Sequence, residues 1–231
     1  MRLDKFLSQN SERSRSLIQQ AIKAGRVTVD GTIAKKGEQK LLGNEIVTLD
    51  GKLVEAFNVR YLMLNKPLGY VCANSDSEHP VVVDLINLPR WQELQIVGRL
   101  DIDTTGLVLL TDDGQWNHRI TSPRHECQKT YKVKTANPID REVIELFTRG
   151  VQLHGEKAPT RPAQLELLSL QEARLTIHEG KYHQVKRMFA ATGNHVVELH
   201  REAIGSITLD PVLASGEFRH LSTDEIQSIY L

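Results

Sequence analysis

Two aspartates and an arginine stand close together in residues 98–107, a stretch that begins with a glycine and also holds two threonines and a second glycine. An apolar run, 107–110, follows at once and is typical of a buried strand. A loop of this composition is expected to hold a carboxylate rigidly beside a cation. With Arg99 two residues away, the Asp101 carboxyl should be ionised at neutral pH, which suits a nucleophile better than a proton donor.

The pair Asp101 and Asp103 also permits other interpretations. A Mg²⁺ or Ca²⁺ site usually collects more oxygen ligands, and the next acids, Asp112 and Asp113, follow only after the apolar run. An aspartate in a loop more often caps a helix or forms an Asx turn, accepting hydrogen bonds from backbone N–H groups. We favour this turn role for Asp103, whereas for Asp101 the wider motif decides.

Two later segments carry side chains that could complete a site. Strand alternation in residues 129–133 puts Lys129, Tyr131 and Val133 on one side. The segment 179–188 follows a helical pattern from about residue 184, and His183, Lys186 and Arg187 fall on one helical face. Those three side chains could contact a phosphate backbone, whatever else the segment does.

The overall composition fits a globular protein of the cytoplasm. Charged residues make up 25% and apolar residues 40%, and no apolar run approaches the length of a membrane span. Only Cys72 and Cys127 are present, so a disulfide framework and a four-cysteine zinc site are both excluded. A zinc site built from histidines is disfavoured because their helical i,i+4 spacing is absent and no cysteine accompanies them: His178, His183, His195 and His200.

Residues 1–54 differ from the rest in charge. Residues 1–40 hold nine Lys and Arg against four acids, a net charge of +5, so the other residues carry −5. Helical spacing covers residues 2–9, and a second helix is expected to begin at a Ser14 or Ser16 cap and to end at Gly25. Residues 26–33 predict a short strand with an Asp-Gly turn, and residues 45–49 a further strand that runs into another such turn. A basic unit of this kind indicates a polyanion-binding module.

This order of elements, with the sequence GRVTVDG after the second helix, resembles the S4-type RNA-binding domain. The resemblance implies that the second helix and the turn after it present basic side chains to structured RNA. The candidates in this chain are Arg13, Arg15, Lys23, Arg26 and Lys35. We therefore predict an S4-like domain at residues 1–57, a connector at 55–60 and a second domain at 61–231.

The second domain shows alternating strands and turns, including expected strands at 61–64 and 70–72 around a Pro-Gly turn. Helical patterns appear at about 141–148, 184–191 and 223–230. Helices are too few to cover both faces of a parallel sheet, and no glycine-rich phosphate loop is present. The fold class is therefore α+β, with a mostly antiparallel or mixed β-sheet flanked by helices.

Residues 98–107 read GRLDIDTTGL and resemble the catalytic motif of pseudouridine synthases, in the form found in the RsuA-type branch. The resemblance implies that Asp101 is the essential nucleophile. In that family a KxY strand supplies a tyrosine that stacks on the target base, here Tyr131 after Lys129. A GxxHQV(K/R) motif supplies the basic residue that pairs with the aspartate, here Lys186.

Further substrate-binding residues follow from the same resemblance. Leu199 is expected to line the uracil pocket, with core packing as the alternative. Arg99 is expected to bind a phosphate or to fill the space that the flipped base leaves. Lys129, His183 and Arg187 complete the set of expected substrate contacts.

The resemblance implies isomerisation of a specific uridine to pseudouridine in 16S ribosomal RNA, with no cofactor and no metal. Asp101 would attack or deprotonate the ribose, or add to the pyrimidine ring. The sequence GRLDIDTTGLVLLTDDGQW and a C-terminus without a long basic tail favour the small-subunit enzymes. The expected partner is ribosomal RNA in a partly assembled small subunit, bound by a monomer without membrane contact. The alternatives are a synthase for large-subunit 23S RNA, a non-catalytic RNA-binding assembly factor and a metal-dependent nuclease.

Overall fold

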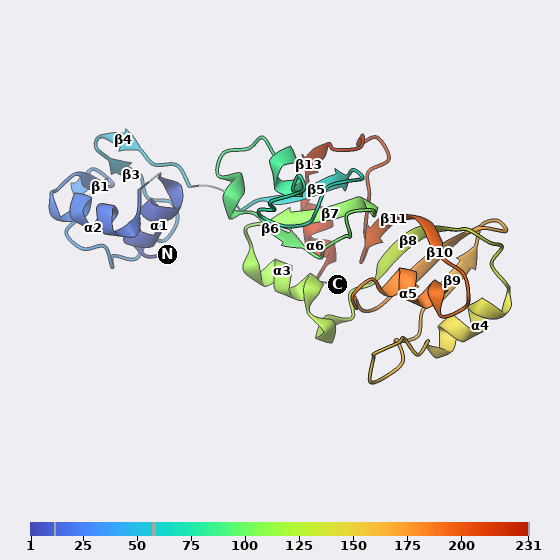
Figure 1. Ribbon diagram of the computed structural model, residues 1–231. Helices are drawn as coiled ribbons and strands as arrows, with labels where there is room; N and C mark the ends of the chain where they lie inside the picture. Colours follow the sequence, from blue (N-terminus) through green and yellow to red (C-terminus); the bar gives the residue numbers. More distant parts are fainter. Residues whose placement is uncertain (12, 57–58, 231) are drawn as a thin grey trace. The chain divides into compact units, whose positions relative to one another are not determined.

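The computed structural model describes residues 1–11, 13–56 and 59–230, and the chain forms two compact units, Met1–Asn58 and Val59–Leu231 (Figure 1). Phe57 and Asn58, in the predicted connector, lie outside the described residues, as does Leu231 at the end of the second predicted domain. Each unit has a hydrophobic core of its own.

The first unit combines two helices, α1 (Leu3–Asn10) and α2 (Arg15–Lys23), with a four-stranded antiparallel sheet. Ser14 caps α2 by accepting a hydrogen bond from the backbone N–H of Leu17, and Gly25 follows the helix with a φ of +69°. Both predicted helices are confirmed. The strands, in the sheet order β2-β1-β3-β4, are β1 (Val27–Val29), β2 (Thr32–Ile33), β3 (Val47–Leu49) and β4 (Lys52–Leu53).

Both hairpins of this unit turn at an Asp-Gly pair. Asp30, Gly31, Asp50 and Gly51 all have positive φ angles, the backbone that a two-residue hairpin turn with the right twist requires. The predicted turns are confirmed. The expected strand at 26–33 is divided by its turn into β1 and β2.

The second unit is built on a mixed sheet of nine strands within the described residues. Seven of them follow the order β13-β5-β7-β11-β8-β10-β9, while β6 pairs with β7 and β12 with β11. Their bounds are β5 (Tyr61–Lys66), β6 (Gln95–Val97), β7 (Thr105–Thr111), β8 (Lys129–Thr135), β9 (Gln164–Leu167), β10 (Glu172–Ile177), β11 (Val196–Ile204), β12 (Ile207–Thr208) and β13 (Phe218–His220).

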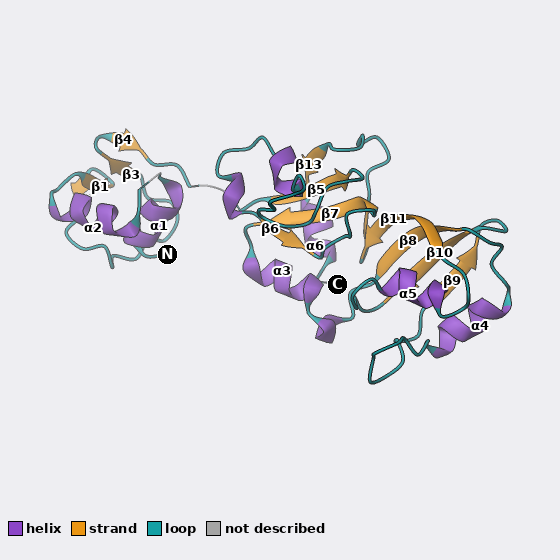
Figure 2. Ribbon diagram, viewed as in Figure 1, coloured by secondary structure: helices purple, strands orange, loops and turns teal. Residues whose placement is uncertain are grey.

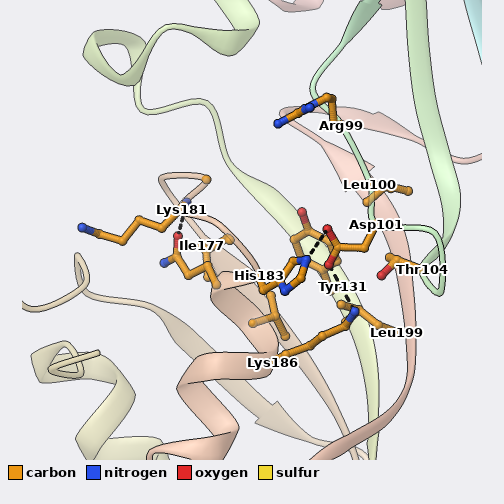
Figure 3. Close-up of a pocket in the computed structure, with 13 residues that line it drawn as sticks. Arg99, Leu100, Asp101, Thr104, Tyr131, Ile177, Lys181, His183, Lys186 and Leu199 are labelled. Carbon is orange, nitrogen blue, oxygen red and sulfur yellow. Dashed lines mark hydrogen bonds and ion pairs between the residues drawn. The ribbon is translucent and has the colours of Figure 1, made fainter. Parts of the chain in front are cut away.

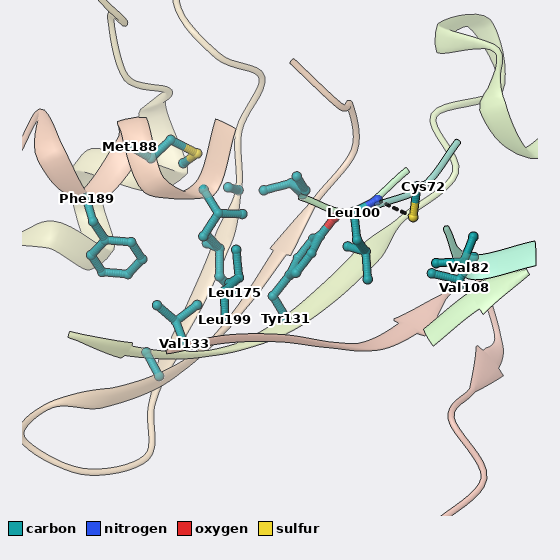
Figure 4. Packing of buried hydrophobic residues seen from close by; sticks show 14 of the residues in the cluster. Cys72, Val82, Leu100, Val108, Tyr131, Val133, Leu175, Met188, Phe189 and Leu199 are labelled. Atoms are coloured by element: carbon teal, nitrogen blue, oxygen red, sulfur yellow. Dashed lines mark hydrogen bonds between the residues drawn. The ribbon is translucent and has the colours of Figure 1, made fainter. Parts of the chain in front are cut away.

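Helices pack against different parts of this sheet, α3 against β6 and β7, α4 against β9 and α5 against β11 (Figure 2). The α-helices are α3 (Gly114–Thr121), α4 (Glu142–Arg149), α5 (Gln184–Ala190) and α6 (Thr223–Ser228), and short 3-10 turns occupy Val82–Leu85, Trp91–Glu93 and Pro123–His125. Alternation along β7 sends Val108 and Leu110 into one core, where Val108 lies beside Val82 (Figure 4), and Leu107 and Leu109 into a second core with Trp116 of α3. The first of these cores also holds Tyr131 and Leu199 (Figure 4).

The centre of the sheet depends on a short parallel pairing of β7 with β11, the one parallel pair among the described strands. There Gly106 lies beside Arg201 with a φ of +101°. A Cβ atom at Gly106 would overlap the carbonyl oxygen of Arg201 and lie 2.8 Å from its nitrogen. The position therefore requires glycine, both for its φ angle and for the close approach of the two strands.

Two local predictions differ from the structure. Residues 70–72 form no strand, because only Val71 makes a bridge, to Val81. The helix α3 was not predicted, although Asp113 caps it by accepting hydrogen bonds from the N–H groups of Gln115 and Trp116. Its eight residues hold only two buried apolar side chains, Trp116 and Ile120, too few for a clear helical pattern.

Candidate active site

Asp101 lies between two basic side chains that come from the distant segment 183–186 (Figure 3). Its Oδ2 accepts a hydrogen bond from Lys186 Nζ at 3.1 Å, and its Oδ1 lies 3.4 Å from His183 Nε2. Lys186 Nζ also donates to Asp103 Oδ1 at 2.5 Å. One cation thus holds two carboxylates, and the Asp101 side chain keeps a third of its surface open, at 31% exposure.

These groups open into a hollow with two parts. The smaller, about 100 Å³, is lined by Asp101, Thr104, Tyr131 and Leu199 among others. The larger, about 750 Å³, shares Asp101 and Tyr131 with it and extends over Lys129 and Tyr182. A small pocket beside a carboxylate, next to a wider hollow, suits one flat group held apart from a longer chain.

The position of Tyr131 follows from strand alternation in β8. Tyr131, Val133 and Thr135 point into the core, while Lys132 is exposed on the other face. The Tyr131 ring is 8% exposed and lines both parts of the hollow, so it forms an aromatic wall beside Asp101. Leu199, opposite Val133 on β11, is equally buried and lines the smaller pocket.

A buried arginine that the sequence analysis missed holds the loop of Asp101. Arg201 on β11 is 1% exposed and donates to the carbonyl oxygens of Gly98 at 3.0 Å, Arg99 at 3.4 Å and Leu107 at 2.8 Å. It therefore ties the start of the loop to the strand after it. The sequence around Arg201 gave no indication of this role, because the groups that Arg201 binds are backbone carbonyl oxygens of a loop far away in the chain.

Lys66 holds the other side of the same loop. Its fully buried ammonium group donates to the carbonyl oxygens of Pro67 at 3.0 Å, Ile102 at 3.4 Å and Thr104 at 2.7 Å. Burial lowers the pKa of Lys66, and nearby acidic groups offset only part of that effect. With Leu100 N–H donating to Cys72 Sγ at 3.3 Å, the loop is fixed from three directions.

Asp103 lies in a turn, as expected, and also contacts Lys186. Burial alone would raise its pKa, but the hydrogen bond and charge of Lys186 outweigh burial and lower it. Burial likewise would lower the pKa of Lys186, and the two carboxylates together raise it. The predicted turn position of Asp103 is therefore confirmed, and the sequence missed only that its carboxylate shares the lysine that holds Asp101.

Helix α5 explains how Lys186 reaches the pocket. Val185, Met188 and Phe189 form the buried face, with Phe189 edge-on to Phe147 at 5.2 Å, and Lys186 lies beside that face. His183 stands before the helix in a left-handed conformation, with φ 47° and ψ 36°. The expected single helical face for residues 183–187 is therefore wrong at His183, which reaches Asp101 from a turn.

The remaining predicted contacts fall into two groups. Arg99 is exposed beside both parts of the hollow, and Lys129 lines the larger part while its Nζ donates to Cys127 O at 2.8 Å. Arg187 lines neither part: its guanidinium donates to Glu156, to Tyr182 O and to His154 O. The structure thus brings all the predicted residues of the second unit together around the hollow except Arg187.

In the first unit, three of the five predicted RNA contacts already face acids. Arg13 and Arg26 both pair with Asp50, at 2.7 and 3.2 Å, and Arg15 pairs with the buried Asp4 at 3.0 Å. Lys23 and Lys35 are exposed and have no ion pair within the part of the chain that the structure describes. Of the five, these two lysines are therefore the cations most open to a new anionic partner.

No group of three or more His, Cys, Asp or Glu side chains in the described ranges is arranged to hold a metal ion. None of the helices in these ranges has the length and apolar character to cross a membrane.

The chain belongs to the RNA pseudouridylate synthase family, whose model matches residues 60–191, and the S4 domain model matches residues 1–55. It is 56% identical over 99% of its length to the ribosomal small subunit pseudouridine synthase A of Escherichia coli K12, and 50% identical over its full length to the protein of that name from Vibrio cholerae; each alignment covers 100% of the relative. A solved structure of a pseudouridylate synthase is 46% identical, covers 99% of both chains and superposes with a TM-score of 0.73. The predicted family, fold class and isomerase activity are confirmed.

Proposed function

We propose that this chain converts one uridine of 16S ribosomal RNA, in the small ribosomal subunit, to pseudouridine. The observation that carries the proposal is similarity along the whole chain, at 50 to 56% identity, to relatives named as small-subunit pseudouridine synthases. The similarity extends over both units. It therefore includes the first unit, which would select the RNA, and the second unit, which would modify it.

Asp101 is the proposed nucleophile. Its support is geometric: the carboxylate faces the hollow, with Lys186 at its Oδ2 and His183 at its Oδ1. Lys186 orients the carboxylate, because its ammonium group donates a hydrogen bond to one carboxylate oxygen from a fixed position on α5. Arg201 and Lys66 fix the backbone on either side of it.

The reaction breaks the bond between C1′ and N1, turns the base and joins C1′ to C5. The proton on C5 leaves and N1 gains one, so atoms balance without an oxidant or an energy source. Attack on C1′, deprotonation of the ribose and addition to the ring all begin from an ionised Asp101. Each route needs the base held still, the role we assign to Tyr131, with Leu199 completing the small pocket.

A uridine within a helix cannot reach Asp101, so the target must be extruded, at a cost of roughly a few kcal/mol. Stacking on Tyr131 offsets that cost, since an aromatic contact contributes about 1–3 kcal/mol per base. Arg99, Lys129, His183 and Arg187 are the proposed contacts to the flanking RNA, and Arg99 is the exposed cation nearest Asp101 in sequence. In this arrangement the flat base enters the small pocket and the strand stays in the larger hollow.

Residues 1–57 are the proposed RNA-binding domain and 61–231 the proposed catalytic domain. Arg13, Arg15, Lys23, Arg26 and Lys35 would contact RNA backbone around the target, on the charge of the unit and its match to the S4 domain. The enzyme is proposed to act as a monomer in the cytoplasm, on RNA in a partly assembled small subunit.

Mapping pseudouridine in a strain that lacks the gene tests the substrate. The expected result is loss of one pseudouridine from 16S RNA, restored by the wild-type gene and not by Asp101→Asn. Loss from 23S RNA instead would overturn the substrate. Restoration by Asp101→Asn would overturn the role of Asp101.

A further inference from the structure

An exposed tyrosine stands at the edge of the larger hollow, and the catalytic assignment leaves it unused. Tyr182 is 73% exposed, in contrast to the 8% of Tyr131. It lines the larger part of the hollow and is absent from the small pocket beside Asp101. Its ring therefore lies outside the space that a flipped uracil would occupy, yet on the surface that the flanking RNA would cross.

One face of the Tyr182 ring is already stacked. It lies on the imidazole of His183 with ring centroids 3.8 Å apart and an interplanar angle of 21°. The same imidazole reaches toward Asp101, with Nε2 3.4 Å from Oδ1. The imidazole of His183 thus lies between the Tyr182 ring and the Asp101 carboxylate, and most of the remaining surface of Tyr182 is exposed.

The backbone fixes this stacked pair in place. His183 adopts a left-handed conformation, which is unfavourable for a non-glycine residue. Arg187 Nη1 donates to Tyr182 O at 3.0 Å and to Glu156 at 3.0 Å, and Lys181 N donates to Gln184 Oε1 at 2.9 Å. A strained turn held from both sides presents a fixed ring, as a preformed contact surface requires.

We propose that Tyr182 stacks on the base next to the target uridine in the substrate RNA. The proposal rests on the proposed function, since it needs a uridine extruded toward Asp101. Extrusion removes a stacking partner from each neighbouring base, and an exposed aromatic ring replaces such a partner without regard to sequence. The larger hollow, about 750 Å³, gives the neighbouring nucleotide room that the small pocket lacks.

The charges around the ring suit the same occupant. Arg99, Lys129 and Lys181 line the larger hollow with Tyr182, and Arg99 has no ion pair among the described residues. A hollow that holds both an aromatic ring and the Arg99 guanidinium, unpaired within the described ranges, matches the two parts of a nucleotide, because the base stacks and the phosphate pairs with the cation. Tyr182 is in this view a substrate-binding residue that acts outside the reacting base.

A double-mutant cycle between protein and RNA tests the proposal. Binding is measured by fluorescence anisotropy with full-length Asp101→Asn protein, so that the RNA is not converted. The RNA is a fragment around the mapped uridine, used intact or with an abasic nucleotide on its 5′ or its 3′ side. Tyr182→Ala is expected to weaken binding of intact RNA roughly 5- to 150-fold, the range for loss of one stacked base. Tyr182→Phe keeps the stack and should bind within about twofold.

The decisive result is coupling. One of the two abasic RNAs lacks the base that Tyr182 is proposed to stack on. On that RNA, Tyr182→Ala should bind as well as the protein with Tyr182, because the stacking contact is already absent. An equal loss on intact and both abasic RNAs, or no loss at all, would overturn the proposal. Tyr230→Ala serves as a matched control, because Tyr230 is also exposed, at 51%, and lines neither part of the hollow.

The outcome stays separate from that of the proposed function. If mapping finds the target in 23S RNA, the proposed substrate fails and the cycle is run on that RNA instead. Coupling there would support Tyr182, and its absence would overturn Tyr182, whichever subunit holds the uridine.

Discussion

The ion pairs around Asp50 and Asp4 in the first unit and those around Lys186 in the second combine acids and bases in opposite proportions. In the first unit one carboxylate serves two arginines: Asp50 faces Arg13 and Arg26, and Asp4 faces Arg2 and Arg15. In the second unit one lysine serves two carboxylates, with Lys186 between Asp101 and Asp103. The first arrangement keeps an excess of positive charge and the second an excess of negative charge.

We therefore expect the first arrangement to attract RNA and the second to serve catalysis. An excess of exposed positive charge draws a polyanion from a distance but is screened by salt. In the pocket, Lys186 holds the Asp101 carboxylate through a hydrogen bond at 3.1 Å, and salt screens such a partly buried pair much less. Changes in the pocket should therefore alter kcat, and changes in the first unit should alter RNA affinity and its salt dependence.

The largest effect is expected from Lys186→Met, which removes the shared cation. We expect kcat to fall about 10²- to 10³-fold, the usual loss when one fixed electrostatic group is removed from a site. RNA affinity should change little, because the side chain faces carboxylates and not the strand. Single-turnover release of tritium from C5-labelled uridine RNA measures the rate, and anisotropy measures binding. Lys186→Arg keeps the charge and should lose less; a Lys186→Met enzyme within threefold of wild type would contradict the comparison.

Arg201→Met should have the next largest effect, on both stability and rate. The change leaves three carbonyl oxygens without their buried donor, and each hydrogen bond from a charged group contributes about 1.5–3 kcal/mol. We expect a clear fall in the urea midpoint and a lower kcat. Arg201→Lys, which keeps the charge and part of the bonding, should fold well enough for kinetics. If its kcat equals that of wild type, Arg201 supports the sheet alone and not the loop of Asp101.

The sequence predicted those parts of the fold and site that local patterns determine. The helices α1, α2, α4 and α5 follow from apolar spacing, and the hairpin turns of the first unit follow from Asp-Gly pairs. Asp101, Tyr131 and Lys186 were proposed from the residue types in three motifs, and the structure brings these side chains to one pocket. Family resemblance supplied the link between segments far apart in the chain.

The contacts that depend on tertiary structure were out of reach. Arg201 and Lys66 bind backbone carbonyl oxygens of a loop distant in sequence, and any residue type presents such acceptors. Asp103 looked like a turn residue because Lys186, its partner, lies more than 80 positions away. The left-handed turn at His183 removed that side chain from the helical face that spacing had predicted.

In the first unit, Lys23→Ala with Lys35→Ala should reduce affinity and not rate. Each lost phosphate contact lowers the slope of log K against log salt by about 0.7–0.9. The double variant should therefore lose roughly 1.5 from that slope, with kcat at saturating RNA unchanged. Lys132→Ala with Lys134→Ala removes the same charge from the face of β8 opposite Tyr131 and should leave the slope as it was. Equal slopes for the two double variants would count against RNA contact by Lys23 and Lys35.

The smallest effect should come from Asp103→Asn, which leaves Lys186 with a single carboxylate. Because Asp103 helps to raise the pKa of Lys186, its loss should lower that pKa and move the alkaline limb of kcat to lower pH. At neutral pH we expect a few-fold loss of kcat and a stability change of about 0–1 kcal/mol, since the Asp103 side chain is 62% exposed.

The sign of the stability term follows from the lowered pKa of Asp103. A carboxyl whose pKa is lower in the folded state contributes stability above its ordinary value of 3.8, and that contribution is lost as the pH falls through the lowered value. The urea midpoints of wild type and Asp103→Asn should therefore differ at pH 7 and converge toward pH 3. Asp84→Asn, an exposed aspartate on the turn Val82–Leu85, controls for the change in net charge. If the difference between the two urea midpoints stays constant between these pH values, the amide in Asp103→Asn alters packing. The Asp103 carboxylate would then not help Lys186 to position Asp101.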